Sequence, residues 1–551
     1  MEKINRNINP SSLLINEYFF LFACFVLSVV IIDPFVNFPI GDDWSYASTV
    51  KRFVDHGVFK PAGWTSMPLI TNVLWGSLFS SVFGHSHTVL RISTLVLSFI
   101  GMIYFIRTMK MLGAGKLFVI IAALLAAFNP LYFHLSNTFM TDVPFVAISI
   151  ITMYYFIKFI KTDISKFFTI SVILSILAIL SRQTGLFMPL SFALFVLFNT
   201  KFKYTKKAIL TGILIIAAAS LPFYNFILSA ADSVPELYTF QSGKLMFTLQ
   251  NPVKVSINLM RAFLFFFNSA GIFLLPLILF NLRAYSFLKE HKTASIMISI
   301  IFIGGSLAAL VPEHLFPFYQ KGLVSIFGFN PPVTKDIFIL GQQNLPVIPY
   351  SIRLFLTIFS AFSGAVLLST ILINLWNRRK KLKNDLIPLF IYSALIYALP
   401  VSLIRSFDRY YIILFFIIMF MLVLIAPKSN SMLLKTPAII FTFVLAVFTL
   451  TSNATFFNYK QSQLKAVKYL ETNNIPPEKV DAGFEYSGMK LYDTAYEYKE
   501  GNSWWWIKND EYLISMGEQK EYKTIKQYTF KNILFNTENH IFIQRQNTIS
   551  D

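Results

Sequence analysis

The sequence predicts an all-α polytopic membrane protein with about thirteen transmembrane helices and a small extracytoplasmic α/β domain at its C-terminal end. Of the 551 residues, 55% are hydrophobic and only 14% are charged, whereas soluble domains carry about 25% charged residues. A soluble fold could not bury so many large apolar side chains. These side chains also fall into separate runs, each about as long as a bilayer is thick, which indicates membrane spans.

Thirteen apolar runs are long enough to be candidates, because a helix needs roughly 20 apolar residues to cross the hydrocarbon core. The first run is too long for the apolar part of a signal peptide and lacks a cleavage site, so we expect an uncleaved helix. The predicted spans cover residues 13–32, 88–106, 117–133, 142–157, 167–181, 185–199, 208–228, 259–281, 294–311, 354–376, 386–404, 410–426 and 437–451.

The distribution of Lys and Arg predicts the orientation, since cytoplasmic loops near spans are rich in both. With a cytoplasmic N-terminus, the inside segments hold 22 of these residues in 70 positions and the outside segments 11 in 143. Only residues 181–184 separate the runs 167–181 and 185–199, and one merged span would place Lys201–Lys207 outside. Charge therefore favours two spans and an extracytoplasmic C-terminus. The net charge of +19 is a topology signal rather than a nucleic-acid footprint.

The chain changes character near residue 453, which divides it into a transmembrane domain (1–452) and an extracytoplasmic α/β domain (453–551). The second part is polar, with 12 Lys and Arg against 13 Asp and Glu. Its apolar spacing predicts an amphipathic helix over Gln461–Asn474. Aromatic and β-branched residues predict strands at three places: Glu511–Met516, Tyr528–Phe535 and His540–Gln544.

The first outer loop, residues 33–87, is too long to be a passive connector and begins with two adjacent acids, Asp42 and Asp43. Neighbouring carboxylates raise each other's pKa, so one could serve as a general base. The alternative interpretation is a solvated loop start, or a cap for a helix over residues 45–54.

Asp142 opens the fourth predicted span at the same membrane face as Asp42 and Asp43. By itself it could be a plain helix cap, but acids at membrane depth are costly and tend to be functional. Asp42 and Asp142 could also hold a divalent cation such as Mg or Mn.

Arg182, Arg405 and Arg409 lie at outer junctions of predicted helices, and Tyr410 follows the last of them. Arginine suits phosphate recognition because its planar guanidinium donates several hydrogen bonds. The alternative for each arginine is snorkelling at the interface, and for Tyr410 an aromatic belt.

Taken together, these features resemble the GT-C superfamily of membrane glycosyltransferases, and most closely its aminoarabinose transferases and protein O-mannosyltransferases. Gly41–Ala47, which contains the acid pair, is similar to the acidic motif that opens the family's first outer loop. Thr141-Asp142 matches a further acid at the second outer turn, and Arg409-Tyr410 matches an Arg-Tyr step before a late span. The family's Lys-Pro-Pro step is replaced by Trp64–Leu69, so we expect either that Lys60 or an arginine substitutes for that lysine or that the donor head group differs.

The resemblance implies an inverting hexosyl- or pentosyltransferase of the plasma or inner membrane. It would move a sugar from a polyprenyl-phosphate donor to a lipid, glycan or protein acceptor at the outer face. Asp42 would activate the acceptor or, with Asp142, shape the site, and Asp43 would orient the loop. The other expected site residues are donor-phosphate ligands (Arg182, Arg405, Arg409 and Lys60) and aromatic residues that line the substrate (Trp44, Tyr46 and Tyr410).

Two other classes compete with this interpretation. A lipid or sugar transporter or flippase would place its site near mid-membrane, often with an inverted repeat, whereas here the charged residues gather at one face and no repeat is visible. An envelope-polymer ligase or polymerase would share a large outer loop. The acid pair after the first span favours the glycosyltransferase interpretation over a ligase or polymerase.

Overall fold

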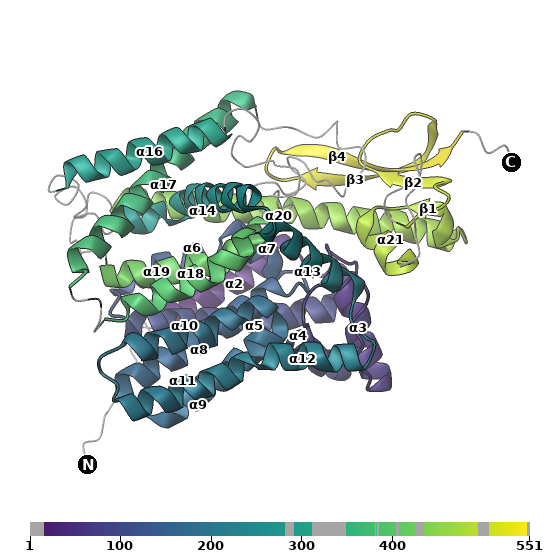
Figure 1. Ribbon diagram of the computed structural model, residues 1–551. Helices are drawn as coiled ribbons and strands as arrows, with labels where there is room; N and C mark the ends of the chain where they lie inside the picture. The colour runs from purple at the N-terminus through teal and green to yellow at the C-terminus, as the bar shows by residue number, and fades with distance from the viewer. Residues whose placement is uncertain are drawn as a thin grey trace, which may run out of the picture.

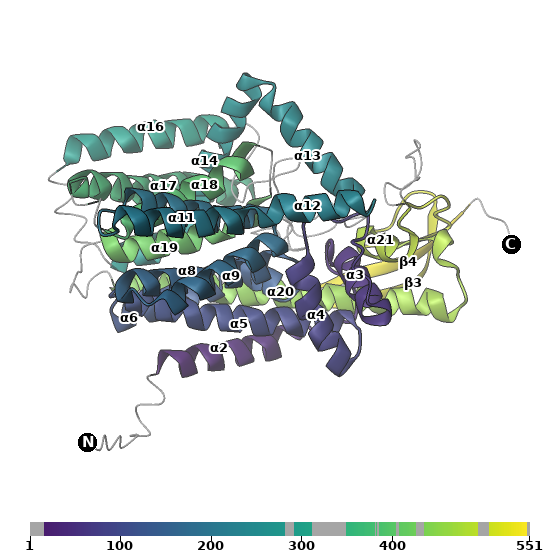
Figure 2. The same ribbon diagram turned by 60° about the horizontal axis from the view of Figure 1, so that its bottom comes forward.

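The structure is a computed structural model that describes residues 16–280, 291–310, 349–380, 382, 385–403, 407–425, 435–493 and 506–547. Long helices run side by side to form a bundle, and a small sheet lies beyond one end of it (Figure 1). Figure 2 shows the same arrangement from another side. This architecture confirms the predicted class, a helical membrane protein with a small C-terminal sheet.

Each of the thirteen predicted apolar runs coincides with a helix or a pair of helices. Within the described residues, eight helices are long and apolar enough to cross a membrane, or nine if the bent pair α6 and α7 is one span. The number of crossings itself stays a prediction. The bundle helices are α2 (Glu17–Ile32), α5 (His87–Met111), α6 (Lys116–Ala127), α7 (Pro130–Ser136), α8 (Asp142–Thr162), α9 (Ser165–Ser181), α10 (Phe187–Phe198), α11 (Tyr204–Ala218), α12 (Ser220–Ala230), α14 (Pro252–Phe280), α16 (Lys292–Leu310), α17 (Tyr350–Arg378), α18 (Ile387–Leu403) and α19 (Ile412–Ile425).

A sharp turn separates α9 from α10. Arg182 has an extended backbone (φ −145°, ψ 136°) that ends α9, and the short 3₁₀ turn η1 (Gln183–Leu186) follows. A Cβ on Gly185 would lie 2.5 Å from the backbone of Ala178. Only glycine therefore lets the turn pack this closely against the helix it has just left.

The helices α9 and α10 run in opposite directions along α8. Phe168, near the start of α9, contacts Phe159 near the end of α8, with ring centroids 5.1 Å apart. Phe187, the first residue of α10, contacts Phe145 near the start of α8, at 6.2 Å. The segment 167–199 thus folds as two antiparallel helices, the arrangement that the charge distribution favoured.

Small residues bring bundle helices into close contact. A Cβ on Gly271 of α14 would lie 2.3 Å from the backbone of Gly364 in α17. A Cβ on Gly101 of α5 would likewise lie 2.7 Å from Ala147 of α8. Close backbone approach at small residues is a common way to pack helices in lipid, where the hydrophobic effect does not drive their association.

The predicted span 117–133 is broken into α6 and α7, which meet at an angle of 63°. Pro130 cannot continue the hydrogen-bond ladder of α6 but suits the first turn of a new helix. The Asn129 side chain caps that helix by accepting hydrogen bonds from the backbone N–H groups of Leu131 and Tyr132. The result is a short helix, α7, which is buried throughout.

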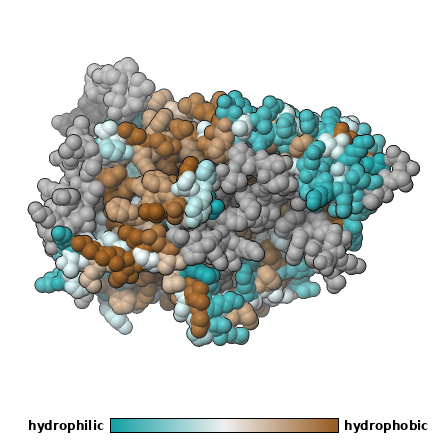
Figure 3. All heavy atoms as spheres, turned by 90° about the horizontal axis from the view of Figure 1, so that it is seen from above, coloured by the Kyte–Doolittle hydropathy of each residue, from teal (hydrophilic) through white to brown (hydrophobic). Residues whose placement is uncertain are grey.

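Apolar side chains cover the outside of the bundle. In the most hydrophobic 18-residue stretches of α11–α12 and of α16, only 22% and 17% of the residues are buried. The side chains of Phe223, Phe226 and Ile301 are each more than 60% exposed. In the space-filling view, hydrophobic residues gather over the bundle and hydrophilic residues over the sheet end (Figure 3). Lipid is the medium in which such an outer surface is stable.

Three further helices lie in the outer segments. The predicted helix over residues 45–54 is confirmed as α3 (Asp43–His56). Two others, α4 (Ile70–Phe83) and α13 (Glu236–Leu249), fall in segments for which no helix was predicted. Figure 2 shows α3 and α4 between the bundle and the C-terminal sheet.

The C-terminal part is built on one long helix. Helix α20 (Lys435–Thr472) runs without a break from its apolar half into the predicted amphipathic segment, so the predicted domain boundary at residue 453 falls inside it. The three predicted strands are confirmed, with shifted ends, and join a short additional strand in a sheet of order β1-β2-β4-β3. The remaining elements are η5 (Pro477–Lys479), β1 (Val480–Asp481), α21 (Phe484–Leu491), β2 (Tyr512–Ser515), β3 (Tyr522–Asn532) and β4 (Thr537–Gln546).

Strand pairing places β4 between β2 and β3, antiparallel to both, while β1 pairs with β2 in parallel. The apolar side chains of this sheet join the core of the bundle: Ile541 and Ile543 of β4 belong to the same buried cluster as Phe156 of α8. The C-terminal part is therefore packed onto the membrane domain rather than connected to it by a linker.

Candidate functional site

Hydrogen bonds from Arg91 and a turn at Gly41 fix the backbone at the start of the first outer loop. Arg91 of α5 is buried and donates hydrogen bonds to the carbonyls of Pro34, Val36 and Phe38. Gly41 follows in the left-handed conformation (φ 61°), which glycine adopts without strain. This path leaves Asp42 directly before α3.

Asp42 lies at the N-cap position of α3, but its side chain makes no capping hydrogen bond. Its Oδ1 accepts a hydrogen bond of 2.9 Å from the indole Nε1 of Trp64, and its Oδ2 accepts one of 3.3 Å from Nη2 of Arg409. The side chain is 24% exposed. The alternative interpretation of Asp42 as a helix cap is therefore wrong, and its carboxylate faces the site.

Asp43 is buried (1% exposed) and turns the other way. Its carboxylate accepts hydrogen bonds from the backbone N–H groups of Ile40, at 2.7 Å, and Phe139, at 3.4 Å. Burial raises the pKa of Asp43 to about 7, although the Arg91 guanidinium and these two N–H groups act in the opposite direction. Asp43 thus joins the first outer loop to the second outer turn and does not face the site.

Asp142 is the first residue of α8, and Arg182 lies in the turn between α9 and η1. Nη1 of Arg182 donates to Asp142 Oδ1 at 2.5 Å and to Thr141 Oγ1 at 3.1 Å. Both side chains are at most 4% exposed. Oδ2 of Asp142 is buried without a hydrogen-bond partner in the described part of the chain. A buried carboxylate oxygen without a hydrogen-bond partner lowers the stability of the fold, and such groups are often found where a protein has a functional site.

Tyr410 lies beside both arginines. Its ring centroid is 4.8 Å from the Arg182 guanidinium and 5.6 Å from that of Arg409. It belongs to the 3₁₀ turn η4 (Asp408–Tyr411) that precedes α19. Tyr46, buried on the first turn of α3, also interacts electrostatically with Asp42 and both arginines, and burial raises its pKa well above the usual value.

We call Asp42, Asp142, Arg182 and Arg409 the four-charge cluster. Two carboxylates alternate with two guanidiniums, and Arg409 interacts with both acids. The four residues come from the start of α3, the start of α8, the turn after α9, and η4. The expectation that these four residues share one face of the membrane domain agrees with their contacts in the structure.

Not every predicted site residue lies in this cluster. Tyr46 and Tyr410 border it, whereas Trp44 points toward the C-terminal part and Lys60 lines a separate cavity. Arg405 lies outside the described residues.

Trp64 is a neighbour of the cluster that sequence reasoning missed. It lies in the stretch that departs from the family pattern, and a hydrogen bond between residues 22 positions apart in a loop leaves no periodic signal. It also belongs to an aromatic cluster with Trp44, Phe484, Tyr492 and Trp506. The ring centroids of Trp64 and Trp506 are 5.2 Å apart, so the side chain that contacts Asp42 packs against the C-terminal part.

A buried ion pair reinforces this junction. Lys460 of α20 and Glu485 of α21 are 1% and 6% exposed, and Lys460 Nζ lies 2.9 Å from Glu485 Oε1. The same oxygen accepts a hydrogen bond from the backbone N–H of Gly41 at 3.3 Å. The C-terminal part therefore contacts the loop that carries Asp42 through both polar and aromatic groups.

The acids of the cluster are a poor match for a divalent cation. Asp42 and Asp142 each contact a guanidinium, which a cation would have to displace, and the described residues contain no group of three or more His, Cys, Asp or Glu side chains suited to a metal. Mg and Mn favour sites rich in oxygen ligands.

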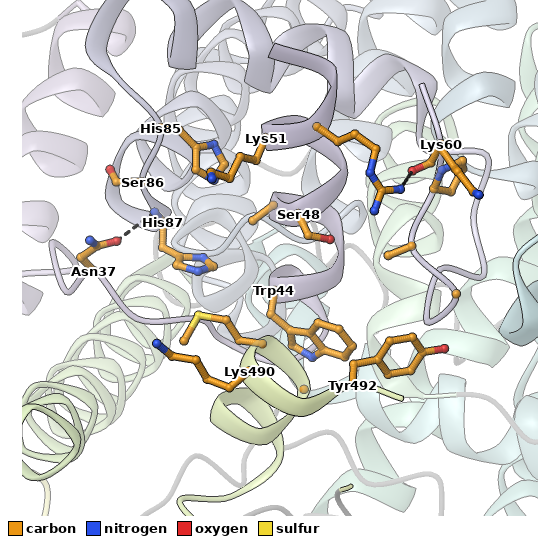
Figure 4. A pocket seen from close by; sticks show the side chains of 17 residues that line it. Asn37, Trp44, Ser48, Lys51, Lys60, His85, Ser86, His87, Lys490 and Tyr492 are labelled. Carbon is orange, nitrogen blue, oxygen red and sulfur yellow. Dashed lines mark hydrogen bonds between the residues drawn. The ribbon is translucent and has the colours of Figure 1, made fainter. Parts of the chain in front are cut away.

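A cavity of about 640 Å³ lies between α3 and α21. Figure 4 shows Trp44 and Ser48 in its middle, Lys51 and the two histidines His85 and His87 on one side, and Lys60 on the other. Lys490 and Tyr492, from the C-terminal part, close it from a third side. We call it the loop cavity.

The fold and the site define a multi-pass membrane protein with a charged, partly exposed cluster at the end of its bundle that carries the C-terminal sheet. Residues 68–225 match the family model described as dolichyl-phosphate-mannose-protein mannosyltransferase. This match confirms the predicted resemblance to the membrane glycosyltransferases of the GT-C superfamily. The matched range contains Asp142 and Arg182, but Asp42 and Arg409 lie outside it.

Two solved structures are similar to the chain at low identity and low TM-score. The structure of ArnT from Cupriavidus metallidurans bound to undecaprenyl phosphate is 9% identical, with a TM-score of 0.46, over 97% of this chain and 98% of that one. The archaeal oligosaccharyltransferase AglB from Archaeoglobus fulgidus, in complex with an inhibitory peptide and a dolichol-phosphate, is 12% identical, with a TM-score of 0.37, over 88% of this chain and 62% of that one. No curated protein matches the chain.

Proposed function

We propose that the protein is an inverting glycosyltransferase that moves a sugar from a polyprenyl-phosphate donor to an acceptor hydroxyl at the outer face of the membrane. The observation that carries this proposal is the four-charge cluster, in which a partly exposed carboxylate, Asp42, lies beside the buried guanidinium of Arg409. A base next to a phosphate-binding cation is what this transfer requires. The family match supports the same reaction class.

In the proposed reaction, the acceptor oxygen attacks the anomeric carbon from the side opposite the phosphate. The bond between that carbon and the phosphate oxygen breaks, and its electron pair stays on the phosphate. Asp42 takes the proton of the acceptor hydroxyl. The products are the glycosylated acceptor, with inverted configuration, and polyprenyl phosphate.

Each member of the site has a separate task in this scheme. Trp64 and Arg409 hold both oxygens of Asp42 and so fix the direction in which it accepts the proton. Arg182 and Arg409 neutralise the charge that grows on the leaving phosphate, an effect that is strong where water is excluded. Asp142 orients Arg182 through their contact of 2.5 Å.

The test is a transfer assay with the purified protein in liposomes. The donors are synthetic polyprenyl-phosphate mannose, glucose and aminoarabinose with labelled sugars, and membranes of the producing cells supply the acceptor. We expect one donor to transfer its label and to release polyprenyl phosphate. Asp42→Asn should lower the rate by about 10²- to 10⁴-fold, the usual contribution of a general base.

Asp55→Asn is the matched control, because Asp55 is an exposed acid on the same helix that pairs only with Lys51 among the described residues. It should leave the rate unchanged. Full transfer by Asp42→Asn would refute the base assignment. Movement of the lipid between leaflets without sugar transfer would instead identify a flippase.

A further inference from the structure

The loop cavity has a size and a lining that suit a small polar ligand. Its volume of about 640 Å³ falls within the range of about 300 to 1,000 Å³ of ligand pockets in proteins. It is formed by the first outer loop, the turn before α5 and helix α21. Trp44 lies two residues after Asp42, so the wall of this cavity belongs to the same loop as the proposed base.

Cations dominate the charge of the loop cavity. The 17 described residues that line it include two lysines on α3 and the loop after it, Lys51 and Lys60, one arginine, Arg52, and one further lysine, Lys490, and none of these 17 is Asp or Glu. Lys51 and Lys490 each have an acid nearby, at 3.7 Å and 3.2 Å. A concave surface with an excess of one charge concentrates ligands of the opposite charge.

Arg52 and Lys60 carry the uncompensated charge. Nη1 of Arg52 donates to the backbone carbonyl of Lys60 at 2.9 Å, which keeps the two residues together. Within the described residues neither of them has a carboxylate partner within 4.0 Å. Both are exposed, so they can take up an anion without first losing a partner.

Aromatic and neutral polar groups complete the lining. Trp44 and Tyr492 have ring centroids 5.3 Å apart and form an apolar wall of the kind that packs against the C–H faces of a sugar. Trp44 Nε1 and His85 Nδ1 are buried without a hydrogen-bond partner in the described part of the chain. Such groups are normally satisfied, and hydroxyl groups of a ligand could satisfy them.

We propose that the loop cavity binds an anionic glycan, namely the part of the acceptor that lies away from the reacting hydroxyl. A sugar ring packs on Tyr492, which Trp44 supports from behind, and carboxylate or phosphate groups of the glycan bind Arg52 and Lys60. This inference rests on the proposed function and names the class of acceptor: an acidic saccharide rather than a neutral one. Lys60, expected to bind the donor phosphate, would instead bind the acceptor.

The experiment measures binding rather than turnover, so its result does not depend on finding the donor. Full-length protein in nanodiscs of phosphatidylcholine is titrated in a calorimeter with tetragalacturonate, with neutral maltotetraose and with inorganic phosphate. We expect tetragalacturonate to bind at least tenfold more tightly than either of the others. The double variant Arg52→Gln/Lys60→Gln should raise its Kd at least tenfold.

Two controls separate the possible outcomes. Lys468→Gln removes an exposed lysine of α20 outside the cavity and should leave the Kd unchanged, and Asp42→Asn should bind like the wild type. Tyr492→Leu should weaken both saccharides but not phosphate. Because Arg52 and Lys60 are exposed, their replacement should not alter the melting temperature, which is checked for every variant.

Equal affinity for tetragalacturonate and maltotetraose, or an unchanged Kd in Arg52→Gln/Lys60→Gln, would overturn the proposal. So would displacement of tetragalacturonate when phosphatidylglycerol replaces phosphatidylcholine, because the cavity would then be a lipid headgroup site. A normal binding profile in a protein that transfers no sugar would refute the proposed function and leave the glycan site standing.

Discussion

Glu485 of α21 accepts a hydrogen bond from the backbone N–H of Gly41, which lies 444 positions earlier in the chain and directly before Asp42. The same carboxylate oxygen contacts Lys460 of α20. A group in the C-terminal part thus holds the backbone from which the proposed base extends. The C-terminal part is a structural component of the site.

Removal of one partner of the Lys460–Glu485 pair should destabilise the protein strongly. Glu485→Gln leaves the Lys460 ammonium buried without its carboxylate, which typically costs about 3 to 5 kcal/mol. Thermal unfolding in detergent should show a clear decrease in melting temperature. The double variant Lys460→Met/Glu485→Leu removes both charges and should recover most of the lost stability. If the two side chains instead contributed independently to stability, the double variant would be less stable than either single variant.

The buried carboxyl of Asp43 should make stability depend on pH. Its pKa is about 7 in the folded protein, above the ordinary value of 3.8, so the folded state holds the proton more tightly than the unfolded state does. Stability is then greatest below about pH 4 as far as this group is concerned, and it decreases as pH rises to about 7. Between these two limits, the ionisation of Asp43 lowers the free energy of unfolding by roughly 4 kcal/mol.

Asp43→Asn should remove this dependence, since an amide imitates the protonated acid and does not titrate. Melting temperatures from pH 5 to pH 8 should fall for the wild type and stay nearly level for the variant. Parallel curves for the two proteins would mean that Asp43 is ionised throughout this range. The control is Asp55→Asn, whose curve should follow that of the wild type.

Arg182→Lys should impair transfer although it keeps the charge. Arg182 contacts Asp142 and Thr141 through one nitrogen while its guanidinium lies against the Tyr410 ring. A lysine ammonium is a compact point charge and cannot keep all of these contacts. We expect kcat to fall by about 10²- to 10³-fold, the usual loss when one donor to a developing charge is removed.

Steady-state kinetics with the donor identified in the transfer assay would measure this loss. Lys206→Arg serves as the control, because Lys206 pairs with Asp163 at an exposed site away from the four-charge cluster. A normal kcat with a raised KM in Arg182→Lys would indicate that Arg182 binds the donor but does not stabilise its departure.

Cysteine labelling should test the predicted orientation. Cys24 is the single cysteine of the chain, so Cys24→Ser provides a background for new cysteines at two exposed positions. Lys468→Cys, in the C-terminal part, should react with an impermeant maleimide in intact cells. Asp163→Cys, at the other end of α8, should react only after permeabilisation, because the segments around it carry the Lys and Arg excess of a cytoplasmic loop. The opposite pattern would reverse the topology.

Much of the architecture could be predicted because hydropathy is a local property. Each apolar run corresponds to helical structure, and the helix at the start of the first loop and the three C-terminal strands were also predicted. The break between α6 and α7 was missed, although Asn129 and Pro130 mark it, because the apolar run continues through both residues. The domain boundary at residue 453 reflects a change of composition, and the helix continues across it because both halves are good helix formers.

The sequence by itself determined the membrane architecture and the side of the membrane to which Asp42, Asp142, Arg182 and Arg409 were assigned, because hydropathy and charge can be read one segment at a time. Only the tertiary structure decided which of these groups meet. It turned Asp42 toward Arg409 and Trp64, and it buried Asp43 against two backbone N–H groups. It also brought Glu485 to Gly41 and left a cationic cavity around Trp44. The physical reason is that such contacts depend on how distant helices pack, and no local pattern of residues records that packing.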